Sequence, residues 1–138
     1  MEQRQIYITE FDMQRLQELL TEAKRLNRHG DQYLESLEAE LSRGKQVAPK
    51  DIPPDVVTMN SRVRLVDMDT GEEMIYSLVF PQEADLAQSK ISVLAPIGTA
   101  MLGYRVGDVF LWKVPDGIRK LRLEEVLYQP EASGNYDL

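Results

Sequence analysis

The stretch APIGTAMLGYRVGD, residues 95–108, carries the clearest local signal of the fold. Pro96 suits the first position of a helix, because proline has no N–H to leave unpaired there and its φ is already close to helical. Gly103 can adopt the left-handed conformation that ends a helix. We therefore expect about two turns of mostly apolar helix between them, followed by a Val-Gly-Asp turn into an apolar strand.

Strand patterns lie on both sides of this short helix. The run 74–80 has apolar residues on both faces, which is typical of a central strand. Pro115-Asp116-Gly117 stands between two apolar runs and predicts a hairpin. The expected strands cover residues 62–65, 74–80, 91–94, 109–114 and 118–128, with a polar loop at 82–90. They predict a small antiparallel sheet with the short helix packed on it.

Residues 9–43 have helical periodicity that is interrupted once, at 27–30. Leucines and other apolar residues recur at steps of three and four, at Met13, Leu16, Leu20 and Ala23 and again at Leu34, Leu37 and Leu41. Thr9 can cap the first helix, with Asp12 as a short variant of the capping box, and Gly44 can end the second. This pattern predicts an antiparallel helical hairpin, about 20 to 27 Å long at 1.5 Å per residue.

A proline-rich segment separates the two patterns. Residues 47–54 contain three prolines, which stop a helix and favour extended backbone. The predicted fold class is therefore α+β, with a helical arm at residues 1–48 and a sheet domain at residues 49–138.

Composition narrows the classes of partner and chemistry. The net charge is −7, and nearly all of the excess acid lies in residues 51–138. We therefore expect a protein partner with a basic surface, and no direct sequence-specific nucleic-acid binding. The sequence has no cysteine and one histidine, which excludes disulfides, thiolate zinc sites and histidine pairs.

Targeting signals are not evident. The first residues lack the basic and then apolar pattern of a secretion signal, and no run approaches the roughly 18 apolar residues of a membrane span. We expect a cytoplasmic monomer with no cofactor, no bound metal and no membrane association.

Three motifs give the chain a family resemblance. Asn-Ser-Arg-Val at 60–63, Asp-Thr-Gly-Glu at 69–72 and the segment 96–108 resemble the Gre family of bacterial transcription factors. Within that superfamily, the segments 55–63, 95–98 and 128–132 are similar to the nucleoside diphosphate kinase regulators, the Rnk type. The resemblance implies an FKBP-like second domain and an N-terminal coiled coil that enters the secondary channel of RNA polymerase.

The resemblance also directs attention to the tip of the helical arm. Gre factors have Gly-Asp there, with a Glu three residues after the Asp, and these acids help to hold magnesium for transcript cleavage. Gly30-Asp31 matches the first half, but Leu34 stands where the Glu would be. Glu35 follows one position later, about 100° around the helix. Asp31 also has the simpler interpretation of a helix cap, and the candidate tip residues are Arg25, Arg28, Asp31 and Glu35.

The loop before the short helix is the second candidate site. In Gre factors it typically reads Asp-Ser-Pro and docks on the polymerase, whereas here it reads Leu94-Ala95-Pro96. Docking would then depend on apolar contact, and the candidate residues are Leu94, Ala95, Pro96, Ile97 and Met101.

Four functions remain open from the sequence. The leading one is a non-catalytic regulator that binds RNA polymerase near its secondary channel and competes with Gre-type factors. A transcript-cleavage factor is disfavoured by Leu34 and the short arm, and a peptidyl-prolyl isomerase by an aromatic content of 7%. A free-standing dimeric scaffold joined through the arm would elute as a stable dimer.

Overall fold

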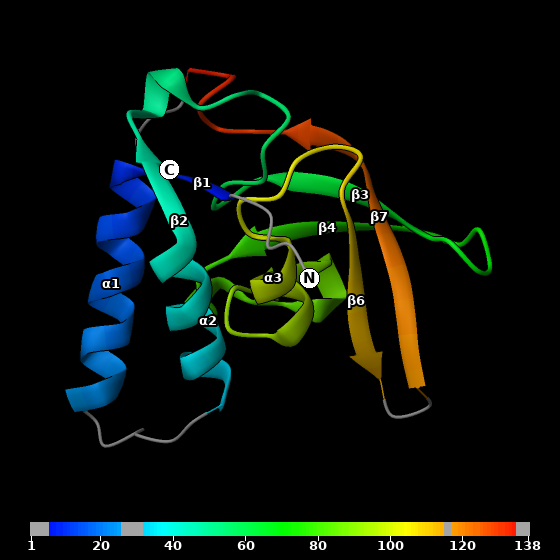
Figure 1. Cartoon of the computed structure of the whole chain (residues 1–138), viewed down its shortest axis with the longest axis horizontal. Helices are drawn as coiled ribbons and strands as arrows, with labels where there is room; N and C mark the ends of the chain where they lie inside the picture. The colour runs from blue at the N-terminus through cyan, green and yellow to red at the C-terminus, as the bar shows by residue number, and fades with distance from the viewer. Residues whose placement is uncertain (1–5, 26–31, 115–116, 135–138) are drawn as a thin grey trace.

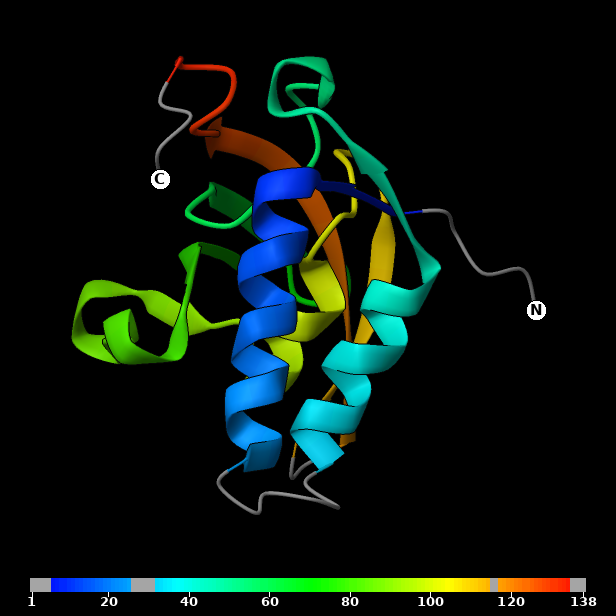
Figure 2. The same cartoon turned by 90° about the vertical axis from the view of Figure 1, so that its left-hand side faces the viewer.

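Two helices form the N-terminal part of the protein. The computed structural model describes residues 6–25, 32–114 and 117–134. Helix α1, Glu10–Arg25, and helix α2, Gln32–Arg43, lie side by side and run antiparallel (Figures 1 and 2). The predicted pair of helices is confirmed, while the turn predicted at 27–30 lies outside the described residues. Of the described residues, none belongs to a helix long and apolar enough to cross a membrane.

The start of α1 shows how the sequence sets a helix boundary. The Thr9 hydroxyl accepts a hydrogen bond from the Asp12 N–H at 3.0 Å, as an N-cap does. The predicted capping box is only half right, because the Asp12 carboxylate binds Arg15 and the N–H of Met59 instead of returning to Thr9. Asp12 therefore ties the helix to a distant part of the chain.

A two-stranded parallel sheet lies where α1 begins and α2 ends, and the sequence patterns did not predict it. Strand β1, Ile6–Thr9, precedes α1 directly, and β2, Gly44–Val47, follows α2 directly, with Ile6 opposite Gly44. A Cβ at Gly44 would come within 2.6 Å of Cδ1 of Ile8, so a side chain there would require Ile8 to shift. The segment interpreted as a linker is thus partly strand, and it continues into a 3₁₀ turn, η1, Pro49–Asp51.

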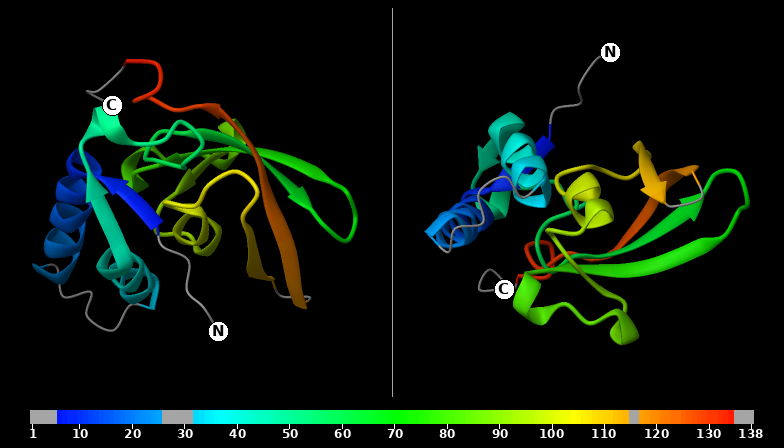
Figure 3. Two further views of the ribbon diagram at one scale, coloured as in Figure 1. Left: turned by 45° about the horizontal axis from the view of Figure 1, so that its top comes forward. Right: turned by 90° about the horizontal axis from the view of Figure 1, so that it is seen from below.

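The larger sheet has five strands and is mixed. Its order is β5-β4-β3-β7-β6, and β5 runs parallel to β4 while the other pairs are antiparallel (Figures 1 and 3). The strands are β3, Arg62–Asp67; β4, Glu73–Val79; β5, Lys90–Ser92; β6, Val109–Val114; and β7, Gly117–Tyr128. The prediction of a wholly antiparallel sheet is therefore wrong. The polar loop between β4 and β5 contains two 3₁₀ turns, η2, Pro81–Glu83, and η3, Leu86–Gln88, and it returns the chain in the direction of β4.

One continuous hydrophobic core connects the helices with the sheet. Leu16 and Leu37 of the helices belong to the same buried cluster as Leu65 and Leu121 of the sheet and Met101 of helix α3, Pro96–Met101. Helix α3 lies between the helical pair and the sheet (Figure 1). The opposite face of the sheet carries exposed apolar residues, among them Ile75, Leu111 and Ile118. The domain boundary near residue 48 stays a prediction.

Candidate functional site

Helix α3 begins and ends where the sequence predicts. Pro96 is its first residue, and Gly103 follows it with a φ of +80°. The Thr99 hydroxyl donates to the carbonyl of Val93 at 2.6 Å, which fastens the helix to the segment before it. At Gly98, an added Cβ would lie 2.2 Å from the carbonyl oxygen of Ser92, so the helix can approach that backbone only with a glycine there. The corner at 92–99 is thus tightly packed.

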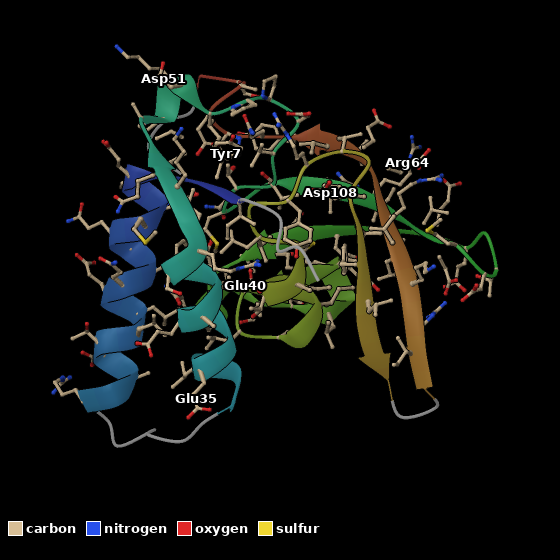
Figure 4. The ribbon with its side chains drawn as sticks, viewed as in Figure 1. Tyr7, Glu35, Glu40, Asp51, Arg64 and Asp108 are labelled. Atoms are coloured by element: carbon tan, nitrogen blue, oxygen red, sulfur yellow. The ribbon has the colours of Figure 1, made fainter. Side chains whose placement is uncertain are left out.

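The predicted turn after α3 is also present. The N–H of Asp108 donates to the carbonyl of Arg105 at 3.0 Å, and the Asp108 carboxylate accepts the Arg105 N–H at 3.0 Å. Asp108 is buried just before β6, where Figure 4 labels it. This turn leads the chain from α3 into β6, which is an edge strand of the sheet.

The five candidate docking residues do not share one surface. Leu94 and Ala95 are half-buried and border the core, and Pro96 takes its place in the backbone as the first residue of α3. Ile97 is 4% exposed and Met101 is fully buried. These two residues are four apart, so they lie on the same side of the helix, which is the side that faces the core. Ile97 and Met101 therefore offer little surface for the apolar docking contact expected of them, whereas Leu94 and Ala95 keep part of theirs accessible.

The candidate tip residues are only partly described. Arg25, the last residue of α1, is exposed and forms an ion pair with Glu22. Glu35 is exposed on α2 near the grey connection in Figure 4. Arg28 and Asp31 lie outside the described residues. Within the described ranges, no three acidic or histidine side chains come together as a metal site would require.

Leu34, the position where a second tip carboxylate would be needed, has a structural role. Its side chain is 5% exposed and belongs to the hydrophobic core with Leu37 and Leu41. Packing between the helices therefore accounts for the leucine, and Glu35 points elsewhere because neighbouring helical residues differ by about 100°.

A buried polar network, which sequence reasoning missed, joins α1 to the body of the protein. The Asp12 carboxylate accepts the N–H of Met59 at 2.9 Å and the Arg15 guanidinium at 2.6 Å. The neighbouring Thr58 hydroxyl donates to the carboxylate of Glu131 at 2.7 Å. The Thr58 and Ser61 hydroxyl oxygens also share a hydrogen bond, at 2.9 Å. The network holds the helix, the loop at 58–61 and the C-terminal segment together.

Gln129 makes a second connection between the same segments. Its side-chain amide donates to the carbonyl oxygens of Pro53, at 2.8 Å, and Val56, at 2.7 Å. The two sequence motifs at 55–63 and 128–132 thus contact each other across the fold. A signal for this contact existed, since both motifs contributed to the family resemblance, but their spacing in sequence did not show that they pair.

The environment of Asp12 alters its acidity. Burial raises the pKa of the Asp12 carboxyl to about 6, against the lowering effects of Arg15 and of the Met59 N–H, and the nearby Glu131 raises it further. Asp67 differs, because the N–H of Asp69 and the guanidinium of Arg119 lower its pKa. Asp12 is therefore a carboxyl group that exchanges its proton near neutral pH.

Comparison with known sequences matches these motifs to two profiles. The profile described as "Transcription elongation factor, GreA/GreB, C-term" matches residues 52–128, and the one described as "Rnk N-terminus" matches residues 4–47. A protein of Escherichia coli K12 described as "Regulator of nucleoside diphosphate kinase" is 39% identical over 132 residues, which is 95% of each chain. The chain belongs to the Gre-factor superfamily, in its Rnk branch. A "Transcription elongation factor GreA" of Acetivibrio thermocellus is 37% identical over 76% of this chain and 66% of that relative.

Solved structures of the Gre superfamily share this fold. A "Prokaryotic transcription elongation factor GreA/GreB from Nitrosomonas europaea" is 40% identical, with a TM-score of 0.75 over 91% of this chain and 100% of that chain. The "GreA factor homolog 1 (Gfh1)" of Thermus thermophilus is 28% identical, with a TM-score of 0.50 over 91% of this chain and 100% of that chain. The family places this chain with regulatory factors, of the Gre and Rnk type.

Proposed function

We propose that the protein is a non-catalytic transcription regulator that binds RNA polymerase near its secondary channel and competes there with Gre-type cleavage factors. Its relatives include proteins described as transcription elongation factors and as regulators of nucleoside diphosphate kinase. We extend the regulatory effect on nucleoside diphosphate kinase to this chain, exerted through the polymerase.

The single observation that carries the proposal is the burial of Leu34. A tip that helps to hold magnesium needs two oxygen ligands that point out together, because magnesium prefers carboxylate oxygens and keeps its waters otherwise. The side chain at the second of these positions is apolar and packed in the core. The arm can therefore occupy a channel without supplying the missing ligand.

The corner at 94–96 is the proposed docking point. Leu94 and Ala95 leave part of their surface accessible, and the hydrogen bond of the Leu94 N–H to the Ser92 hydroxyl, at 3.0 Å, fixes their backbone. A rigid apolar corner loses little conformational entropy on binding, which favours affinity.

The proposal includes the organisation that the sequence predicts. The helices act as a short coiled-coil arm at residues 1–48, and residues 49–138 act as an FKBP-like docking domain. The protein works as a cytoplasmic monomer, and its contact with nucleic acid is indirect, through the polymerase.

A competition experiment tests the proposal. Immobilised RNA polymerase should retain the protein, and an excess of a Gre factor should displace it. Leu94→Glu should weaken retention about tenfold or more, because a carboxylate would have to lose its water in an apolar contact. Leu111→Glu is the matched control, since Leu111 is 60% exposed on the far face of the sheet.

Both variants must keep the unfolding temperature of the wild type to within a few degrees. Retention that is insensitive to the Gre factor, or equal for the two variants, would contradict the proposed docking point.

A further inference from the structure

A groove lies beside α1, on the side that faces η2. Figure 2 shows the ribbon of α1 next to the green segment that contains η2. The groove has a volume of about 470 Å³ and is lined by Arg15, Glu18, Leu19, Glu22, Phe80 and Glu83 among others. Among the described residues, neither Leu94 and Ala95 of the docking corner nor the tip candidates Arg25 and Glu35 are part of its lining. The groove is therefore a separate feature of the surface.

The wall of the groove is held in place by stacking and by a buried ion pair. The Arg15 guanidinium lies 4.0 Å from the ring centre of Phe11 and 4.8 Å from that of Phe80, so it stacks between a helix residue and a residue at the end of β4. It also binds the buried Asp12 carboxylate at 2.6 Å. Because the contact of Arg15 with Phe80 crosses from α1 to the end of β4, the groove exists before any partner binds.

The groove combines an apolar floor with an acidic rim. Phe80 is buried and Leu19 is half-buried, while Glu18, Glu22 and Glu83 are exposed around them. Glu22 already pairs with Arg25. Glu18 and Glu83 form no ion pair with any side chain in the described part of the protein, so their charges are available to a partner.

The acidic surface continues along the helix. A shallower hollow of about 410 Å³ borders the groove and shares Glu18 and Glu22 with it, and its other lining residues, Gln14, Gln17 and Thr21, are uncharged. Arg15 also lies along this side of α1, but the Asp12 carboxylate lies against its guanidinium and offsets its positive charge. The sign of the surface along this side of α1 is therefore negative.

We propose that this groove binds a basic segment of a partner protein, one that places an apolar side chain on Leu19 and Phe80 and directs lysine or arginine toward Glu18 and Glu83. Apolar contact at the centre with charged groups at the rim is the usual arrangement of a protein docking surface. An acidic peptide or a nucleic acid would meet like charge on the rim and is disfavoured. The site acts independently of docking at 94–96, so each can fail without the other.

A peptide titration of the full chain tests this proposal. The probe is a 12-residue peptide of alternating Leu, Lys and Arg, and the control is a peptide in which Glu replaces every Lys and Arg. Amide ¹H–¹⁵N spectra should show shifts that cluster at residues 15–22 and 80–83 with the basic peptide and none of comparable size with the acidic one. Shifts spread evenly over the acidic surface, or clustered elsewhere, would overturn the proposal.

Two double variants separate the groove from general charge attraction. Glu18→Gln with Glu83→Gln should weaken binding of the basic peptide about tenfold, as expected for the loss of two rim ion pairs. Glu73→Gln with Glu125→Gln removes the same number of negative charges, both of them beside Arg64. This second pair should change the affinity for the basic peptide less than twofold. Figure 4 places Arg64 on the sheet, far from α1.

Equal weakening in the two double variants would mean that the peptide responds only to net charge, and no weakening in either would mean that it binds elsewhere. Both results overturn the proposal. Leu19→Ala completes the test, since removal of part of the apolar floor should weaken binding severalfold while the charge stays unchanged.

Discussion

The carboxyl group of Asp12 ties α1 to the loop at 58–61 and has a raised pKa. Its pKa is about 6 in the folded protein, against 3.8 for an ordinary Asp, because burial penalises the charged form. The folded state therefore binds this proton more tightly than the unfolded state does. The contribution of Asp12 to the free energy of unfolding is therefore greatest below about pH 4. It falls as the pH rises toward 6, by up to roughly 1.4 kcal/mol per pH unit.

Asp12→Asn removes that titration. The stability of the variant relative to the wild type should therefore increase between pH 4.5 and pH 7.5, as measured by urea unfolding at each pH. Asp67→Asn is the control, because the pKa of Asp67 is lowered, so its stabilising effect is constant between pH 4.5 and pH 7.5 and is lost only on further acidification. Parallel stability profiles for wild type and Asp12→Asn would show that Asp12 keeps its ordinary pKa.

At the scale of elements, the sequence predicted what local periodicity and special residues determine. The helices α1 and α2 follow from apolar residues at steps of three and four, and α3 follows from Pro96 and Gly103. Strands β1 and β2 have four residues each and pair in parallel across the whole helical hairpin, so neither has a pattern long enough to recognise. The parallel pairing of β5 with β4 is likewise set by the path of the 80–90 loop, which no local pattern encodes.

The segment that follows β7 offers a test of how such elements are held together. The side-chain amide of Gln129 donates hydrogen bonds to the carbonyl oxygens of Pro53 and Val56, and Gln129 is only 2% exposed. Gln129→Ala would leave the carbonyl oxygen of Val56 without this donor, at a cost of about 1 to 3 kcal/mol, whereas the carbonyl oxygen of Pro53 still accepts the Val56 N–H at 3.2 Å. We expect a loss of about 1 to 3 kcal/mol in the free energy of unfolding, measured with urea.

Gln88→Ala serves as the reference for that variant. Gln88 is an exposed glutamine in η3, and its replacement should change stability by less than about 0.5 kcal/mol. A similarly small change for Gln129→Ala would show that water replaces the amide, and that the C-terminal segment contributes little to the fold.

At the scale of the whole molecule, the sequence identified the right segments but could not assign their surfaces. The corner at 94–97 was recognised from its motif, yet only the three-dimensional structure shows that Ile97 is buried while Leu94 and Ala95 stay partly exposed. The contact between the motifs at 55–63 and 128–132 was missed for the same reason. Periodicity reports which positions are apolar, whereas exposure depends on which elements pack together.

The arm and the sheet domain together predict how the protein acts on a stalled polymerase. With Leu34 packed in the core, Asp31 is the one acid of the Gre pattern that this sequence keeps, and a single carboxylate neutralises little of the charge of magnesium. We expect no shortening of RNA in backtracked complexes above the polymerase's own rate. When a Gre factor is present, adding this protein should reduce its cleavage in proportion to the ratio of the two proteins. The assay measures RNA length over time, with Leu94→Glu as the variant that should lose the inhibition.

Leu34→Glu should not gain cleavage, because its carboxylate would have to leave the core and unpack the helices to reach a metal. Cleavage by the wild type that Asp31→Asn abolishes would contradict the idea of occlusion without chemistry and make the protein a cleavage factor.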